Sequence, residues 1–112
     1  MGRFTSVADT DAIEAECAYA DRDLPVTMYQ FLTSTRDRFP DRPAVSYQLL
    51  SGPGDKAETL TWAALHARVT QMANLFRSLG AGEKDVVASL LPNCTETGVV
   101  LLAGAVAGRV NP

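Results

Sequence analysis

The feature that most limits the possible folds is a stripe of large apolar side chains between positions 62 and 79. Its members recur at steps of three and four residues: Trp62, Leu65, Val69, Met72, Phe76 and Leu79. This spacing places all six on one face of an α-helix. Thr61 precedes the stripe as an N-cap, and Gly80 follows it as a stop signal. Because burying each such side chain contributes about 1.5–3 kcal/mol, this helix needs a broad apolar partner.

A second helix and a β-hairpin are expected before the stripe. The segment 27–39 begins with a capping-box spacing, in which Gln30 follows Thr27 by three residues, and it ends at Pro40. Residues 44–61 hold two short strand-like runs, joined by a stretch rich in glycine, proline and serine. This arrangement predicts an antiparallel pair of strands with a turn between them.

Two apolar segments follow the long helix. Residues 85–91 are apolar on both faces, which predicts an inner strand of a sheet. Residues 94–108 predict a helix that is apolar around its circumference, with Asn93 and Glu96 at capping-box spacing. Strand–helix–strand order is typical of parallel α/β proteins, and residues 109–112 would begin the next strand. The predicted fold class is therefore α/β: helix, β-hairpin, helix, strand and helix, with an incomplete parallel sheet.

Composition excludes several classes of protein. The 112 residues carry a net charge of -3, so no basic surface for nucleic acid is expected. The apolar run of the last helix is too short to span a bilayer, and no signal peptide is visible. Cys17 and Cys94 lack the spacing of metal ligands. A reducing, cytoplasmic location is the simple interpretation, and a disulfide between the two is the alternative.

The first 24 residues differ from the rest in charge. Up to Pro25 the chain has two bases and six acids: Arg3, Arg22, Asp9, Asp11, Glu14, Glu16, Asp21 and Asp23. The segment 12–20 could form a short helix. We interpret residues 1–24 as an acidic, flexible leader and residues 25–112 as the folded part of the chain.

Reactive chemistry is scarce in this sequence. The stretch 51–59 has the glycines, lysine and hydroxyl of a phosphate-binding loop, but Pro53 removes an amide donor and a strand follows instead of a helix. A hairpin turn is the better interpretation. His66 lies beside the apolar stripe with no evident catalytic partner, and Cys94 lies near a helix start. The four acids between Asp9 and Glu16 fit a solvated tail. The residues therefore predict no catalytic, cofactor-binding or metal site.

A family resemblance accounts for this combination of a fold and little chemistry. Residues 25–112 resemble the start of the AMP-forming acyl-CoA synthetases, within the adenylate-forming superfamily. The matching motifs, in order, are Pro40-Asp41 with Pro43-Ala44, Leu60-Thr61-Trp62 with Leu65, Leu79-Gly80, Asp85 to Ala88, Leu91-Pro92-Asn93 with Glu96, and Gly104 and Gly108 with Asn111-Pro112. Within that family the chain looks most like bacterial fatty-acyl-CoA synthetases.

The resemblance implies a ligase reaction that uses ATP, Mg²⁺ and coenzyme A to convert a carboxylic acid, here a fatty acid, to an acyl-adenylate and then an acyl-CoA. The family's catalytic segments normally lie beyond the part matched here. The chain is therefore expected to be a truncated member that is inactive alone and needs no cofactor itself. Two alternatives stay open: an α/β interaction module that self-associates through the apolar residues 94–112, and a small nucleotide-binding domain that uses residues 51–56.

Overall fold

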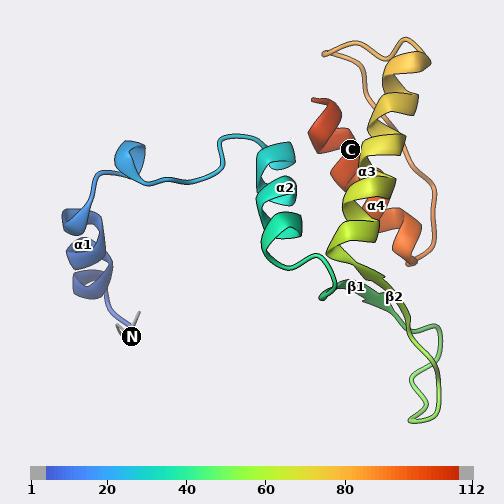
Figure 1. Ribbon diagram of the computed structural model, residues 1–112, viewed down its shortest axis with the longest axis horizontal. Coiled ribbons are helices and arrows are strands. Elements are labelled where there is room, and N and C mark those ends of the chain that lie inside the picture. The colour runs from blue at the N-terminus through green and yellow to red at the C-terminus, as the bar shows by residue number, and fades with distance from the viewer. Residues whose placement is uncertain (1–4, 109–112) are drawn as a thin grey trace.

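The computed structural model describes residues 5–108 of the chain. In chain order its elements are helix α1 (Val7–Glu16), a short 3-10 helix η1 (Tyr19–Asp21), helix α2 (Met28–Arg38), strands β1 (Pro43–Tyr47) and β2 (Glu58–Thr61), helix α3 (Trp62–Ser78) and helix α4 (Thr95–Ala107). Figure 1 shows α2, the hairpin and α4 gathered around α3, while α1 lies apart.

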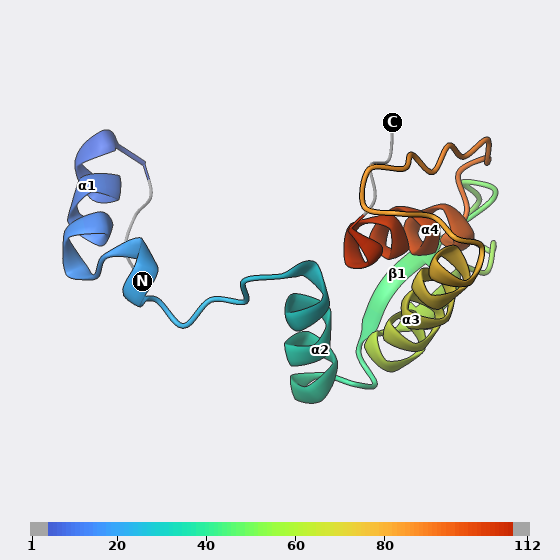
Figure 2. The ribbon, with the colours of Figure 1, turned by 90° about the horizontal axis from the view of Figure 1, so that it is seen from above.

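Helix α3 is the centre of the packed part, because α4, α2 and both strands contact it. Figure 2 shows α4 and β1 beside it. The core is small and consists of Leu32, Leu60, Leu65, Val69, Ala73, Val99, Ala103 and Ala107. The predicted stripe supplies its buried side chains Leu65 and Val69, and Trp62, Met72 and Phe76 pack around them. The prediction that Leu79 belongs to the core is wrong, because this residue is 74% exposed. It caps the end of α3, which rises beyond α4 in Figure 1.

Local capping signals formed as predicted at two helix starts. The Thr27 hydroxyl accepts from the Gln30 amide at 3.1 Å, and the Gln30 side chain accepts from the Thr27 amide at 3.3 Å. Thr61 accepts from the Ala64 amide at 3.2 Å at the start of α3. Gly80 adopts φ +81° at its end, a conformation that favours glycine.

The prediction of Asn93 as the cap of α4 is wrong. The helix begins one residue later, with Cys94 as N-cap and no side-chain capping bond. Glu96 instead lies in the first turn, where its carboxylate accepts from the Thr95 hydroxyl at 3.2 Å. A hydrogen bond from its own amide, with further ones from Cys94 and Thr95, lowers the pKa of Glu96. An acid in the first turn also complements the helix dipole.

The β-hairpin has the predicted antiparallel pairing. Val45 pairs with Leu60, Ser46 with Thr59 and Tyr47 with Glu58, and the register shifts between Pro43 and Val45. Leu60 points into the core and is 5% exposed. On the opposite face the hydroxyls of Ser46 and Thr59 are 2.9 Å apart. The hairpin therefore closes one end of the helical core with a single apolar side chain from β2.

The predicted inner strand at residues 85–91 does not form a ladder. In the described part of the chain the sheet is the two-stranded antiparallel pair β1–β2, so the expected parallel sheet is not present there. Val86 has a single bridge, and residues 87–92 carry no regular assignment. Val86 is 58% exposed and Leu90 is fully exposed. An inner strand needs partners on both edges, and residues 5–108 supply no such pair. The predicted start of a further strand, 109–112, lies outside the described residues.

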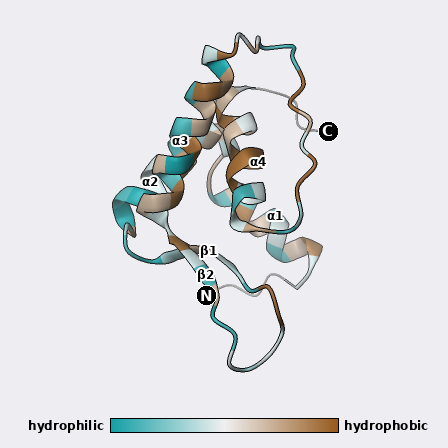
Figure 3. Ribbon diagram, turned by 90° about the vertical axis from the view of Figure 1, so that its right-hand side faces the viewer, coloured by the Kyte–Doolittle hydropathy of each residue, from teal (hydrophilic) through white to brown (hydrophobic). Residues whose placement is uncertain are grey.

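Apolar residues are concentrated along α4 and along the segment that leads into it, as Figure 3 shows. Val99, Ala103 and Ala107 are buried, whereas Leu101 is 45% exposed. One side of this all-round apolar helix is thus covered by α3 and the hairpin.

The leader forms more structure than predicted but lies apart from the core. Helix α1 begins at Val7 instead of near Ala12, because Ser6 and Asp9 make a capping box that sequence reasoning missed. Its C-terminal end is held by the Arg22 guanidinium, which donates to the carbonyls of Ile13 at 2.6 Å and Cys17 at 3.2 Å. No residue of α1 is buried.

Candidate functional site

The loop between β1 and β2 is a turn closed by its own polar groups. The Asp55 carboxylate accepts from the Gly52 amide at 2.9 Å, and the Asp55 amide donates to the Gly52 carbonyl at 3.1 Å. The Gln48 side chain donates to the carbonyls of Gly52 and Asp55, both at 3.1 Å. A phosphate loop needs free amides that point inward and a helix that follows. Here Asp55 occupies the Gly52 amide and β2 follows, so the loop does not fit a nucleotide phosphate.

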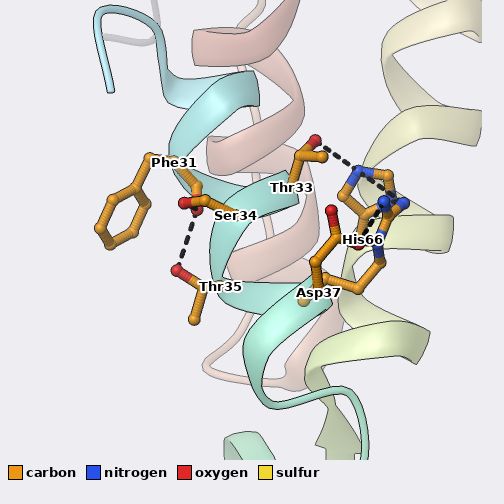
Figure 4. A network of polar contacts seen from close by, with 7 residues as sticks. Phe31, Thr33, Ser34, Thr35, Asp37 and His66 are labelled. Carbon is orange, nitrogen blue, oxygen red and sulfur yellow. Dashed lines mark hydrogen bonds and ion pairs between the residues drawn. The ribbon is translucent and has the colours of Figure 1, made fainter. Parts of the chain in front are cut away.

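His66 is brought into a polar contact between two helices. It lies on α3 and is 7% exposed. Its Nε2 is 3.0 Å from the Thr33 hydroxyl of α2. Arg36 Nη1, also from α2, is 3.2 Å from Nδ1 and 3.4 Å from Nε2. Figure 4 shows Thr33 pointing from α2 toward the imidazole ring. The Tyr29 ring lies 5.3 Å from it, tilted by 41°.

Sequence reasoning placed His66 beside the stripe but missed its partners. Tyr29, Thr33 and Arg36 recur at steps of four and three along α2, and this spacing puts them on one helix face. That spacing is the sequence signal for the contact, although the apolar residues of 27–39 dominate the pattern of the segment.

The surroundings of His66 do not suit a catalytic base. A hydroxyl beside an imidazole resembles part of a catalytic triad, but a triad places a carboxylate at the other ring nitrogen to stabilise the imidazolium. Here the guanidinium of Arg36 lies near Nδ1. Burial lowers the pKa of His66, Arg36 lowers it further, and Asp37 opposes them. The ring is therefore held neutral beside a cation, which disfavours taking a proton from Thr33.

The acids of the leader serve its own helix. The Asp9 carboxylate accepts from the amides of Thr5 and Ser6 at 3.1 and 3.0 Å and from the Ser6 hydroxyl at 2.9 Å. These bonds, led by the one from the Ser6 side chain, lower the pKa of Asp9. Among the described residues no group of three or more His, Cys, Asp or Glu side chains could hold a metal ion.

Both cysteines are free, so the alternative of a disulfide is not realised in the structure. Cys94 is half-buried at the N-cap of α4, with its sulfur 3.4 Å from the Thr97 hydroxyl. No helix among residues 5–108 is both long and apolar enough to cross a membrane.

A shallow hollow of about 440 Å³ opens near the His66 contact, between α2, α3 and α4. Its lining is Tyr29, Thr70, Ala73, Asn74, Arg77 and Val106. Arg77 donates to the Asn74 side chain at 3.3 Å, and both residues are exposed. A ligand site usually holds a few buried, convergent polar groups, and the polar residues of this hollow are too exposed to meet that description.

Comparison with known proteins identifies the family of the chain. The sequence profile described as AMP-binding enzyme matches residues 32–111, well over half of the chain. The chain belongs to the AMP-binding enzyme family. This confirms the resemblance drawn from the motifs between Pro40 and Pro112.

Curated relatives of this family member are acetyl-coenzyme A synthetases. The protein of Yersinia pestis (strain Pestoides F) is 40% identical over 57 residues, which are 51% of this chain and 9% of the relative. The protein of Psychromonas ingrahamii is also 40% identical over 57 residues, with the same coverage. That of Sodalis glossinidius is 39% identical over 56 residues, 50% of this chain and 9% of the relative. The chain thus spans about a tenth of the length of the relatives it matches.

The motif residues of this AMP-binding family member act as joints of the fold. In the turn after α2, the carbonyls of Pro40 and Arg42 accept from the Ala63 and Trp62 amides at 3.0 and 3.1 Å, so the turn ties the end of α2 to the first turn of α3. Asp85 accepts from the Gly82 amide and donates its own amide to the Gly82 carbonyl at 3.1 Å, which closes the turn after α3.

The next motif forms a further joint. The Thr97 hydroxyl donates to the Pro92 carbonyl at 2.6 Å, which fixes the entry into α4. Three of the family motifs in the described residues are therefore explained by contacts that hold the fold together, whereas the motif residues Val86 and Leu91 are exposed.

Proposed function

We propose that residues 25–112 form the N-terminal scaffold of an AMP-forming acyl-CoA synthetase domain, and that these 112 residues alone do not activate an acid. The family match supports the first part. The loop 51–58 supports the second, because its geometry does not fit a nucleotide phosphate.

The observation that carries the proposal is the extended segment after α3. It has strand-like composition on both faces, yet Leu90 is fully exposed and Val86 is 58% exposed. Paired strands satisfy their amides and carbonyls through neighbouring strands, and an apolar strand left outside a sheet gains nothing from burial. The segment has the character of an inner strand of a larger sheet.

In the longer protein the resemblance implies two chemical steps. A carboxylate oxygen attacks the α-phosphorus of ATP, and pyrophosphate leaves with the electron pair of the broken P–O bond. The coenzyme A thiol then attacks the acyl carbon and AMP leaves, with Mg²⁺ assisting the first step. No described residue of this chain is assigned a role in either step. The acid is proposed to be a fatty acid, and acetate is the competing substrate because the relatives are named acetyl-coenzyme A synthetases.

The direct test is ATP–pyrophosphate exchange. The 112-residue chain is assayed with acetate, octanoate and palmitate, next to the product of the reading frame extended past the Pro112 codon. We expect no acid-dependent exchange from the 112 residues and clear exchange from the extended product, greatest with palmitate. Exchange by the short chain contradicts its proposed inactivity. Greater exchange with acetate than with palmitate contradicts the fatty-acid proposal and indicates a short carboxylic acid as the substrate. A frame that reads into no ligase-like sequence contradicts the scaffold proposal.

The interaction-module alternative finds less support. It needs an exposed apolar surface on residues 94–112, but α4 already buries Val99, Ala103 and Ala107 where it packs against α3. Sedimentation velocity distinguishes the two: the module predicts a discrete dimer that a Leu101→Ser substitution dissociates, and the scaffold proposal predicts no such species.

A further inference from the structure

We propose that His66 is a pH-sensitive latch that holds α2 against α3 when neutral and loosens that contact when protonated. The inference concerns this chain's own folding and does not depend on the proposed acyl-CoA chemistry. It rests on the placement of one buried ring between two helices and on the hydrogen-bonding capacity of its neighbours.

The latch is a bridge between α2 and α3. Apart from the bond of Thr33 to Nε2 and the contact of Arg36 with the ring, α2 contributes one fully buried side chain, Leu32. The other large side chains of α2 are partly exposed, including Phe31 at 48% and Tyr29 at 43%. The turn after α2 holds the C-terminal end of the helix, and α4 also contacts α2. Along the helix itself, the docking of α2 on α3 depends on Leu32 and on the contacts around His66.

The chemistry of Arg36 decides which form of the ring fits. A guanidinium only donates hydrogen bonds, so the ring nitrogen that faces it must carry a lone pair. With Nδ1 as that acceptor, Nε2–H donates to the Thr33 hydroxyl. With Nε2 as the acceptor, the Thr33 hydroxyl donates to it at 3.0 Å and Arg36 Nη1 lies 3.4 Å from it. Each neutral tautomer therefore offers one lone pair to Arg36 and still bonds Thr33. A protonated ring has two N–H donors and no acceptor. It loses the bond from Arg36 and places a second positive charge about 3.2 Å from the first.

The charged groups around the ring are few. Helix α2 brings Arg36 and Asp37, which are paired at 2.7 Å, and the Tyr29 ring. The charges that act on His66 are those two, with Arg36 lowering its pKa and Asp37 raising it, both after the larger effect of burial.

The other elements packed on α3 bring their charges elsewhere. The acid of α4 is Glu96, in its first turn, where the nearby charge is Arg68. The acid of β2 is Glu58, which lies 4.0 Å from Arg68. Neither carboxylate compensates a proton on His66.

The direction of the pH dependence follows from the lowered pKa. The unfolded or undocked chain binds the proton more readily, with a pKa near 6.5. The contribution of the latch is therefore complete above about pH 6.5 and is lost as the pH falls toward the lower pKa of the docked state. Acid loosens α2 and leaves α3 and α4 packed.

The test uses hydrogen exchange of the full chain, with amide rates corrected for their intrinsic pH dependence. Between pH 7.5 and 5 we expect the protection of α2 amides around Leu32 to fall, by at most about tenfold per pH unit because one proton is involved. Amides of α3 that face α4, near Ala73, keep their protection. Equal corrected protection of α2 at both pH values overturns the proposal. Because the chain has one histidine, its imidazole NMR signal reports the protonation directly.

Three variants separate the latch from general acid sensitivity. His66→Gln keeps a neutral acceptor and donor, so we expect α2 to stay docked with no pH dependence. Arg36→Gln removes the repelling charge and should weaken the pH dependence, whereas Asp37→Asn removes the compensating charge and should strengthen it. If His66→Gln fails to fold, the two charge variants still decide: identical pH profiles in Arg36→Gln and Asp37→Asn overturn the proposal.

Discussion

The contact between α3 and α4 makes a sharp prediction about side-chain size. Ala103 of α4 is completely buried and Ala73 of α3 is 1% exposed, so small residues allow the two helices to approach closely. Ala105 lies on the exposed side of the same helix. An Ala103→Leu substitution adds three carbon atoms where no surface is accessible, and Ala105→Leu adds the same atoms into solvent.

The magnitude follows from the cost of overpacking, about 1–3 kcal/mol for side chains forced into a filled core. Exposed substitutions usually stay within about 0.5 kcal/mol. For a small protein the urea m-value is about 1–3 kcal/mol per molar, so a loss of about 2 kcal/mol lowers the midpoint by roughly 0.7–2 M.

Urea titration followed by far-ultraviolet circular dichroism measures this difference. Wild type, Ala103→Leu and Ala105→Leu are compared at one pH and protein concentration. We expect a clearly lower midpoint for Ala103→Leu and an unchanged one for Ala105→Leu. Equal midpoints for the two leucine variants refute the packing of α4 on α3 through its alanine face.

Three further predictions address other parts of the chain. Gly80→Ala should destabilise the protein by about 1–2 kcal/mol because φ is +81° there. Gly98→Ala should stabilise it by about 0.5–1 kcal/mol, because there is open space for a Cβ at this position inside α4. Urea midpoints measure both changes, and shifts of the two midpoints in the same direction contradict the assigned conformations. The pKa of Asp9 is held below 3.8, so the cap of α1 should be complete above that pH and be lost as the pH falls further. Amide chemical shifts of α1 between pH 5 and 2 follow the loss of the cap, and Asp9→Asn should remove this pH dependence of the shifts. Leu90→Ser should change the stability of the 112 residues by less than about 0.5 kcal/mol, because the side chain is fully exposed. In an extended product that buries Leu90, the same substitution should cost about 2–5 kcal/mol. Thermal melts of both forms test this, and equally small effects in the two forms contradict an inner-strand role.

Local signals were sufficient for the helices around the core. A capping residue bonds amides within one helical turn of its own position. The capping bonds of Thr27, Gln30 and Thr61 could therefore be predicted from the sequence, and the structure contains them. The stripe on α3 was likewise readable because its period is set by the helix itself. The hairpin was indicated by turn residues between two strand-like runs.

Features that depend on distant residues could not be read in the same way. Whether residues 85–91 pair as a strand depends on neighbours, and composition alone cannot provide them. The environment of His66 depends on α2 residues 30 or more positions earlier, at Thr33 and Arg36. The N-cap of α4 is Cys94, one residue after the predicted Asn93. Helix ends are uncertain by one or two residues, so a capping-box spacing cannot decide between the two positions.

The joint between the turn after α2 and the start of α3 has a consequence for the evolution and labelling of the hairpin. Because Pro40 and Arg42 already hold the first amides of α3, the ten residues between β1 and β2 do not set the position of that helix. A loop in this situation can lengthen cheaply, since each doubling adds about 0.6 kcal/mol of closure entropy. Relatives should therefore vary most in length here, and a fluorophore or epitope inserted near Gly54 should leave the helical core intact.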